Sequence, residues 1–225
     1  NNAVIERLRP DVYRCMAGES PDTIYMKVHD AWRCTNRGEP MFPADVTDGV
    51  VYILRNPLDM AISYYHHFGI SIEKAVKELC DSSNTIARSH GGISDQLRQW
   101  LGSWSDHVRT WMDESGLRVH FVRYEEMRYS PEVVFGSVVR FCGLPYDEAR
   151  VSKAVKFSDF RELQGQEQTK GFRERPTHSA SPFFRYGRPG SWRDELPPHL
   201  SGYIIETHAE TMRRFGYLDE NNRPV

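Results

Sequence analysis

Three short apolar runs stand out from the polar background of the chain, and each predicts a β-strand. Residues 23–30, TIYMKVHD, alternate in polarity and are rich in β-branched and aromatic side chains. Residues 49–55, GVVYILR, form an unbroken apolar run closed by Arg55, which is typical of a strand buried on both faces of a parallel sheet. Residues 117–124, LRVHFVRY, predict the third strand.

Helical periodicity dominates the rest of the chain. Pro57 suits the first position of a helix and pushes Asn56 out of the helical region, so a helix is expected directly after the apolar strand. Apolar residues recur at helical spacing from Leu97 to Trp111 and predict one long amphipathic helix over residues 94–114. Further helices are expected at residues 3–8 (ended by Pro10), 71–80, 130–144, 147–156, 159–163 and 198–215. Residues 81–93 form a predicted loop, and residues 164–181 are polar, lack a hydrophobic period and are expected to be flexible.

Buried strands joined by helices predict an α/β fold of three layers, in which helices flank a parallel sheet. The whole chain, residues 1–225, is expected to form a single domain. Ligands of such folds bind beyond the carboxyl ends of the strands. His29, Arg55 and Tyr124 lie at the ends of the three predicted strands and are therefore the first residues to consider.

Composition and charge narrow the class of protein. The chain has 225 residues and a net charge of −2, so no broad basic field predicts binding to nucleic acid or to an anionic membrane. None of the four cysteines belongs to a C-x-x-C pair or has zinc-finger spacing, which favours a reducing, cytoplasmic setting and predicts no metal site. No apolar run has the length of a transmembrane helix.

Arg55 and Ser63 are the first candidates for ligand binding. An arginine fork with a nearby hydroxyl offers the donors that a phosphate group needs. In the alternative interpretation, Arg55 pairs with a carboxylate such as Asp59, and Ser63 merely faces solvent. Spacing alone favours this second interpretation.

Two further segments carry candidate chemistry. His29 ends its predicted strand, where a general base could act, but the chain has nine histidines and most are expected to be ordinary polar residues. Residues 183–196, FFRYGRPGSWRDEL, combine two glycines with Arg185, Arg188 and Arg193. This segment is either an anion-binding nest of backbone N–H groups and arginines or a solvated basic loop beside a tryptophan.

The order of these segments, more than any one of them, resembles a known family. The motif R-N-P-x-D-x-x-x-S-Y-Y-H starts at Arg55, and FVRYEEM, FSDFREL and the motif R-x-G-x-x-G-x-W at Arg185 follow it. Together they resemble the cytosolic-type sulfotransferases, which use 3′-phosphoadenosine 5′-phosphosulfate (PAPS). The resemblance runs from about Ile24 to Phe215. It implies the sulfotransferase fold, which is similar to that of P-loop nucleotide triphosphatases, and sulfuryl transfer without a metal.

The resemblance implies roles for the residues around the cofactor's phosphate. Arg55 and Ser63 match the pair that grips the 3′-phosphate. Arg185, with the backbone at Tyr186 and Gly187, matches the loop that closes on the same phosphate. Tyr186 departs from the family, which often has a lysine there, so one charge is absent.

Other matches concern the base and the acceptor. Tyr124, Ser158 and Phe160 match residues that hold the adenine, and Trp192 matches a tryptophan beside the loop. His29 matches the histidine that removes the proton from the acceptor, which makes it the expected general base.

One family element has no match in the chain. No segment resembles the phosphosulfate loop Y-P-K-S-G-T-T-W, so we expect an N-terminal strand, loop and helix to be missing. Two rival functions stay open: a non-catalytic domain that binds the product nucleotide PAP, and a different P-loop-like small-molecule transferase or kinase.

The motifs do not identify the acceptor substrate. A small molecule with a hydroxyl or an amine is expected, and the aromatic side chains of Trp32, Phe42 and Phe172 in poorly patterned segments favour an apolar or aromatic one. The sequence leaves the oligomeric state open.

Overall fold

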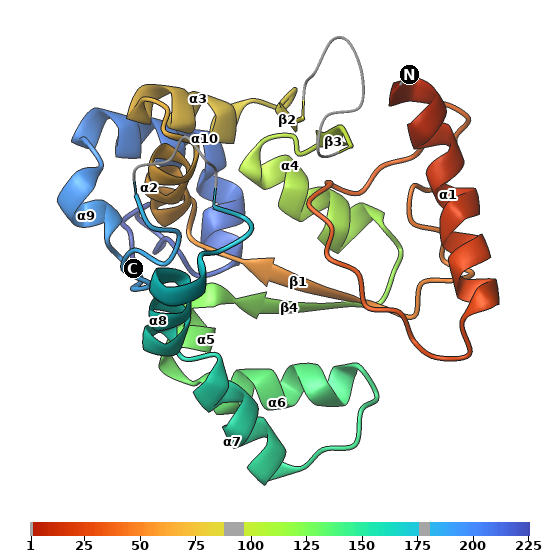
Figure 1. The fold of residues 1–225 in the computed structure, drawn as a ribbon. Coiled ribbons are helices and arrows are strands. Elements are labelled where there is room, and N and C mark those ends of the chain that lie inside the picture. The colour runs from red at the N-terminus through yellow and green to blue at the C-terminus, as the bar shows by residue number, and fades with distance from the viewer. Residues whose placement is uncertain (1, 88–96, 176–180) are drawn as a thin grey trace. The chain divides into compact units, whose positions relative to one another are not determined.

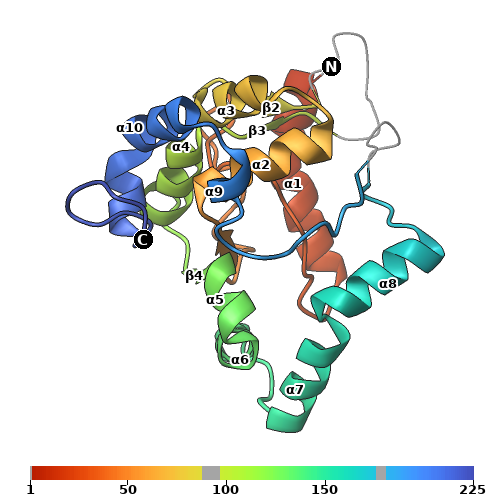
Figure 2. The same cartoon turned by 90° about the vertical axis from the view of Figure 1, so that its left-hand side faces the viewer.

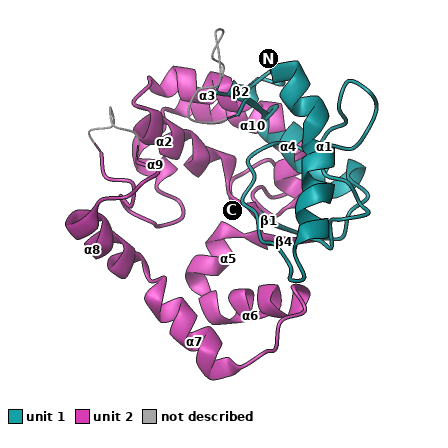
Figure 3. Cartoon of the chain, turned by 45° about the vertical axis from the view of Figure 1, so that its right-hand side comes forward, with its two compact units in different colours: residues 1–52, 80–119 teal, residues 53–79, 120–225 magenta. Residues whose placement is uncertain are grey.

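The computed structural model describes residues 2–87, 97–175 and 181–225 and divides the chain into two compact units (Figure 3). Unit 1 comprises residues 1–52 and 80–119, and unit 2 comprises residues 53–79 and 120–225. Within the described ranges, none of the helices has the length and apolar character that crossing a membrane requires.

A parallel pair of strands, β1 (Val50–Leu54) and β4 (Val119–Arg123), forms the central sheet, and both arrows point the same way in Figure 1. Together with the many helices, this sheet confirms the predicted α/β class. The prediction that β1 is buried on both faces is wrong, because Ile53 is 59% exposed whereas Leu54 is 2% exposed.

Unit 1 is built around a small aromatic core. Met41, Phe42 and Trp111 are buried, and the rings of Tyr13 and Phe42 stack with centroids 5.6 Å apart. The two short strands of this unit pair in antiparallel fashion. Its elements are α1 (Asn2–Glu19), β2 (Thr85–Ile86), β3 (Gln99–Trp100), α4 (Trp104–Arg109) and the π-helical turn η1 (Thr110–Glu114).

Three predictions in unit 1 are wrong. Residues 23–30 form no strand, and Tyr25 is 61% exposed. Helix α1 continues through Pro10, at the point where Arg9 is buried in an ion pair with Asp30. The long helix expected over residues 94–114 begins only at Trp104, and residues 94–96 lie outside the described part of the chain.

The late start of α4 has a local cause. Gly102 adopts a left-handed conformation with a φ of +65°. Ser103 then forms a capping box with Asp106, in which each side chain accepts from the backbone N–H of the other. The later members of the apolar stripe are buried, whereas Leu97 is 39% exposed, and Gly102 and Ser103 delay the start of the helix.

Unit 2 consists mainly of helices. They are α2 (Pro57–Phe68), α3 (Ile72–Cys80, whose last residue falls in unit 1), α5 (Tyr124–Tyr129), α6 (Pro131–Phe141), α7 (Glu148–Phe157), α8 (Phe160–Lys170), α9 (Trp192–Glu195) and α10 (Pro198–Arg214). The predicted start of α2 is confirmed, since the Asn56 side chain accepts from the Leu58 N–H. Ile62, Val76 and Ile204 belong to the buried core of this unit.

Helix α8 is longer than predicted. The expected helix ended at Leu163, and the residues after it were expected to be flexible, but α8 continues to Lys170. Its polar side chains bind the backbone of a later segment: both oxygens of the buried Glu167 carboxylate accept N–H groups, from Phe183 at 2.7 Å and from Phe184 at 2.9 Å. In Figure 2 this later segment leads back to α9 beside α2.

Candidate functional site

The carboxyl ends of β1 and β4 meet at two side chains that the sequence singled out. The guanidinium carbon of Arg55 lies 4.6 Å from the centroid of the Tyr124 ring, which is a cation–π contact. The buried Glu125 carboxylate accepts the Asn56 N–H and the Tyr217 hydroxyl, each at 2.9 Å. Burial, and next the Glu125 charge, raise the pKa of Tyr217, so its hydroxyl stays a donor.

Asp59, in the first turn of α2, holds the glycine loop near the C-terminus. Its carboxylate is 1% exposed and accepts the Gly190 N–H at 2.7 Å, the Trp192 N–H at 3.0 Å and the Ser191 hydroxyl at 3.2 Å. Of the two interpretations that the sequence left open for this loop, the structure shows an anion nest, and the anion in it belongs to the chain itself.

Arg185 is fixed by a carboxylate on the short helix that follows the loop. Glu195 receives Nη1 and Nη2 of Arg185 at 3.1 and 2.9 Å, and Nε2 of His66 lies 2.7 Å from the same carboxylate. Burial acts to raise the pKa of Glu195, but the hydrogen bonds from Arg185 and His66 outweigh it and lower that pKa. The Arg185 guanidinium also lies 4.4 Å from the ring centroid of Tyr186.

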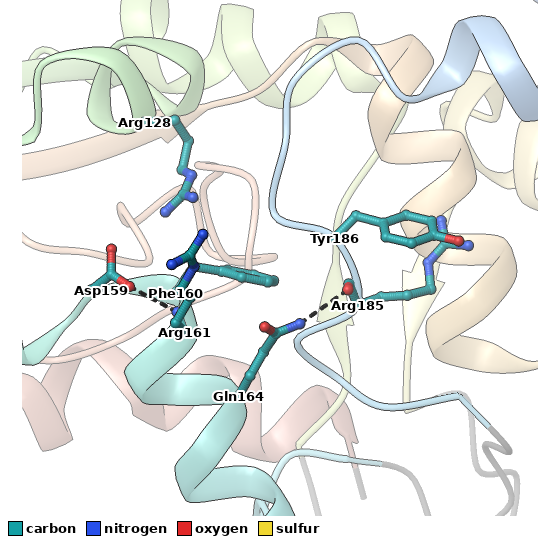
Figure 4. A pocket seen from close by; sticks show the side chains of 7 residues that line it. All are labelled: Arg128, Asp159, Phe160, Arg161, Gln164, Arg185 and Tyr186. Carbon is teal, nitrogen blue, oxygen red and sulfur yellow. Dashed lines mark hydrogen bonds between the residues drawn. The ribbon is translucent and has the colours of Figure 1, made fainter.

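Gly187 and Phe160 are packed so closely that only glycine fits. Gly187 has a φ of +60°, and a Cβ added to it would lie 2.3 Å from the Phe160 ring. Gln164, one turn further along α8, donates to the carbonyl oxygens of Phe184 at 2.8 Å and Arg185 at 3.1 Å (Figure 4). Helix α8 therefore contacts the segment 184–187 in two ways: Gln164 binds its backbone, and the Phe160 ring packs against Gly187.

Unit 2 contains a cavity of about 650 Å³, which Asp59, Ser191 and His66 help to line. That volume lies in the range typical of small-molecule and cofactor sites. All eight residues predicted to contact the nucleotide line it: Arg55, Ser63, Tyr124, Ser158, Phe160, Arg185, Tyr186 and Gly187.

A second cavity, of about 510 Å³, lies beside the first (Figure 4) and shares five lining residues with it: Arg128, Asp159, Phe160, Arg185 and Tyr186. Arg128 and Arg161 reach toward Phe160 in this view, and the Arg185 side chain points away from them alongside Tyr186. The Arg128 guanidinium lies 5.2 Å from the Phe160 ring centroid.

His29, the predicted base, lies in unit 1, where its backbone is held from several sides. Its N–H donates to Gln99 at 3.2 Å, and its carbonyl oxygen lies 3.1 Å from Nε2 of His107. The next residue is held as well: Arg9 forms a two-point ion pair with Asp30 at 2.9 Å. The His29 side chain itself is exposed.

The half-buried His107 ring lies between two oxygen atoms. Nε2 faces the carbonyl oxygen of His29, so it must donate, and Nδ1 then accepts from the Tyr52 hydroxyl at 2.8 Å. Burial lowers the pKa of His107, in accord with this neutral arrangement.

Sequence reasoning missed the carboxylates that build the site. The partners of Asp59, Glu125 and Glu195 come from distant segments, apart from the nearby Arg185, so spacing gives little signal for them. Only Asp59 carries a hint, as the aspartate of the R-N-P-x-D motif. The residues that the structure describes contain no group of three or more His, Cys, Asp or Glu side chains that could hold a metal ion.

Comparison with known proteins defines the class. The family model for the sulfotransferase domain matches residues 41–216, and the chain therefore belongs to the sulfotransferase family. The resemblance drawn from the motifs is confirmed.

Two curated relatives illustrate the similarity. Cytosolic sulfotransferase 16 of Arabidopsis thaliana is 27% identical over 210 residues, which cover 83% of this chain and 61% of the relative. Sulfotransferase 1A1 of Canis lupus familiaris is 29% identical over 171 residues, which cover 74% of this chain and 56% of the relative. The chain thus spans less than two thirds of the length of either relative.

Solved structures agree on the fold. Mouse sulfotransferase SULT7A1 complexed with PAP matches with a TM-score of 0.63 and 20% identity, over 87% of this chain and 68% of that one. Retinol dehydratase in complex with androsterone and the inactive cofactor PAP matches with a TM-score of 0.57 and 18% identity, over 76% of this chain and 50% of that one. The sulfotransferase fold expected from the sequence is confirmed.

Proposed function

We propose that the cavity of unit 2 binds a 3′-phosphoadenosine nucleotide, and that the protein transfers the sulfuryl group of PAPS to a small-molecule hydroxyl or amine. One observation carries the proposal: the eight residues that motif comparison assigns to the nucleotide, although scattered from Arg55 to Gly187, line a single cavity. Two solved sulfotransferase-fold structures are described as PAP complexes, which supports the same ligand.

The residues of the cavity suit the two ends of such a nucleotide. Arg55 and Arg185 supply charged donors and Ser63 a hydroxyl, which is the donor set that a phosphate group requires. The rings of Tyr124 and Phe160 offer apolar faces for a purine. Because Gly187 has no side chain, its backbone can approach a ligand closely.

Catalysis is assigned to His29. When bound, PAPS supplies an activated sulfuryl group, and PAP is the product. His29 takes the proton from the acceptor as the acceptor atom attacks, and the contacts of Gln99 and His107 fix the backbone that carries it. The cavity residues orient the nucleotide, and positioning of this kind supplies much of the acceleration in group-transfer reactions.

An apolar or aromatic acceptor is part of the proposal. Phe183 and Phe184 line the cavity, and Phe172 packs on them with ring centroids 4.5 and 5.0 Å away. His67 meets the Phe183 ring edge to face at 5.6 Å. A cytoplasmic location, suggested by the name of the Arabidopsis relative, completes the proposal.

Two measurements test the function. Thermal shift assays with PAP, ATP and ADP should show the largest stabilisation with PAP, and a preference for ATP would favour the rival kinase. Labelled PAPS offered with a panel of phenols, alcohols and amines should then yield a sulfated product. His29→Ala should abolish that turnover while PAP still binds.

The same two measurements distinguish the proposed enzyme from the rival, a non-catalytic domain that binds PAP. Tight PAP binding without any product from the panel would identify a non-catalytic nucleotide-binding protein. Near-normal turnover by His29→Ala would refute the assignment of the base.

A further inference from the structure

The turn at residues 190–192 directs three donors toward one point. The N–H groups of Gly190 and Trp192 and the hydroxyl of Ser191 all lie within 3.2 Å of the two oxygens of Asp59. Gly190 makes the turn possible with a φ of +82°. Convergent N–H and O–H donors of this kind form an anion-binding nest, and here the anion is a side chain.

The carboxylate in the nest is buried, whereas Gly190 and Trp192 are half-buried. Asp59 is 1% exposed and Ser191 is 6% exposed. A buried carboxylate is stable only where donors replace its lost water, and these three hydrogen bonds do so. Since a carboxylate already saturates the nest, the Gly190 and Trp192 N–H groups are not available to a nucleotide.

The two partners in this contact belong to the two halves of the proposed phosphate site. Asp59 lies on α2 between Arg55 and Ser63, and the nest follows directly after Arg185 to Gly187. One carboxylate therefore joins the segment that carries one set of donors to the segment that carries the other.

We propose that Asp59 is a positioning residue for nucleotide binding, because its carboxylate fills the nest at residues 190–192 and so holds Arg185, Tyr186 and Gly187 at the cavity. This inference rests on the proposed function, in that the ligand held there is a 3′-phosphoadenosine nucleotide. Asp59 and Ser191 also line the cavity, and the role proposed for Asp59 is exerted through its hydrogen bonds to the loop.

Calorimetric titration with PAP tests the positioning role. Asp59→Ala should weaken binding by about tenfold or more, as expected for the loss of charge-assisted hydrogen bonds. Asp59→Asn should also weaken binding, because its NH₂ group would face the loop's donors. The matched control is Asp194→Asn, which removes an exposed carboxylate that pairs with Arg188 beside the same loop, and it should leave PAP affinity unchanged.

Chemical rescue separates a carboxylate in the nest from a general structural role. Formate carries the same two oxygens and is small enough for the space that Asp59→Ala leaves. Added formate should restore PAP affinity in Asp59→Ala and should not improve the wild type or Asp194→Asn. No recovery with formate would overturn the assignment.

Hydrogen exchange without any nucleotide tests the contact independently of the function. Peptides covering residues 189–195 should exchange faster in Asp59→Ala than in the wild type, because two N–H groups lose their acceptor. Equal exchange rates in the two proteins would refute the contact between Asp59 and residues 190–192. Failure of the wild type to bind PAP would refute the proposed function and the positioning role with it, while the exchange comparison would still decide the contact.

A milder variant guards against misfolding. Ser191→Ala removes one donor and keeps both backbone hydrogen bonds, so it should fold and weaken PAP binding by a smaller factor than Asp59→Ala. Unchanged PAP affinity in both Ser191→Ala and Asp59→Asn would overturn the inference.

Discussion

Glu195 holds Arg185 at two points, with nitrogen–oxygen distances of 2.9 and 3.1 Å, and shares the same carboxylate with His66. A long, flexible arginine at a binding site is thereby fixed before any ligand arrives. Because less side-chain freedom remains to be lost on binding, an arrangement of this kind raises affinity without adding a contact.

The stability that this pair contributes should depend on pH. The pKa of Glu195 is lowered, so its contribution is complete above the ordinary carboxyl pKa and is lost as pH falls through the folded value. Glu195→Gln should therefore cost roughly 1 kcal/mol near neutral pH, a figure reduced for partial exposure, and should cost less at about pH 3. Thermal unfolding at both pH values measures this. A gap between wild type and variant that does not narrow in acid would contradict it.

The contact between Gly187 and Phe160 predicts an asymmetry between two glycines. Gly187→Ala should reduce PAP affinity by about tenfold or more, because the new methyl group would overlap the Phe160 ring and φ is positive. Gly165→Ala is the matched control: it lies inside α8, nothing stands within 4 Å of the added Cβ, and it should stabilise the chain by about 0.5–1 kcal/mol. Calorimetry and thermal unfolding of both variants check this. Equal PAP affinity in the two variants would refute the steric argument.

Arg55 should distinguish nucleotides by their 3′-phosphate. Arg55→Ala should weaken PAP binding by roughly 2 kcal/mol, or about thirtyfold, since it removes a charged donor from the proposed phosphate site. The affinity for adenosine 5′-phosphate, which lacks the 3′-phosphate, should fall much less in Arg55→Ala. Calorimetric titration of both nucleotides into the wild type and Arg55→Ala gives the comparison. Equal losses of affinity for the two nucleotides would show that Arg55 does not bind the 3′-phosphate.

His107 predicts a second source of acid sensitivity, in a higher pH range than that of Glu195. Its pKa is lowered chiefly by burial, so the neutral form is favoured in the folded chain, and the stability it contributes is present above about pH 6.5 and lost as pH falls through the folded value. His107→Gln should be less stable than the wild type at about pH 8, and the difference should shrink toward pH 5. The exposed His199→Gln should show no such trend. A pH-independent difference for His107→Gln would contradict the burial argument.

Local signals carried the parts of the site that lie within one segment. Arg55 at a strand end, Asn56 outside the helical region and Pro57 at the first helical position follow from steric rules that act over a few residues, and all three are found as expected. The resemblance proposed eight residues as nucleotide contacts, and the fold brings all eight to one cavity.

The sequence pattern predicted the structure poorly where polar contacts between distant segments determine it. Helix α8 has no apolar period, yet it persists to Lys170 because Gln164 and Glu167 bind the backbone of a segment about twenty positions later. The segment 23–30 has strand-like alternation, but alternation predicts a strand only if a neighbour pairs with it, and within the described ranges it pairs with none.

At the loop of residues 190–192, the sequence indicated one feature and gave no signal for another. Its glycine spacing and donors made an anion nest one of two interpretations, and the structure has a nest there. The occupant could not be predicted, because the Asp59 carboxylate comes from a segment far earlier in the chain.

Glu125 gives the last residues of the fold an influence on the site that their position in the chain conceals. Its carboxylate receives the Asn56 N–H directly after β1 and the Tyr217 hydroxyl just beyond α10. A truncation that removes Tyr217 would leave a buried carboxylate oxygen without its donor, at the base of the turn that presents Arg55. Trimming that end for crystallisation or for a fusion protein would therefore disturb nucleotide binding, although no residue after Tyr217 lines the cavity.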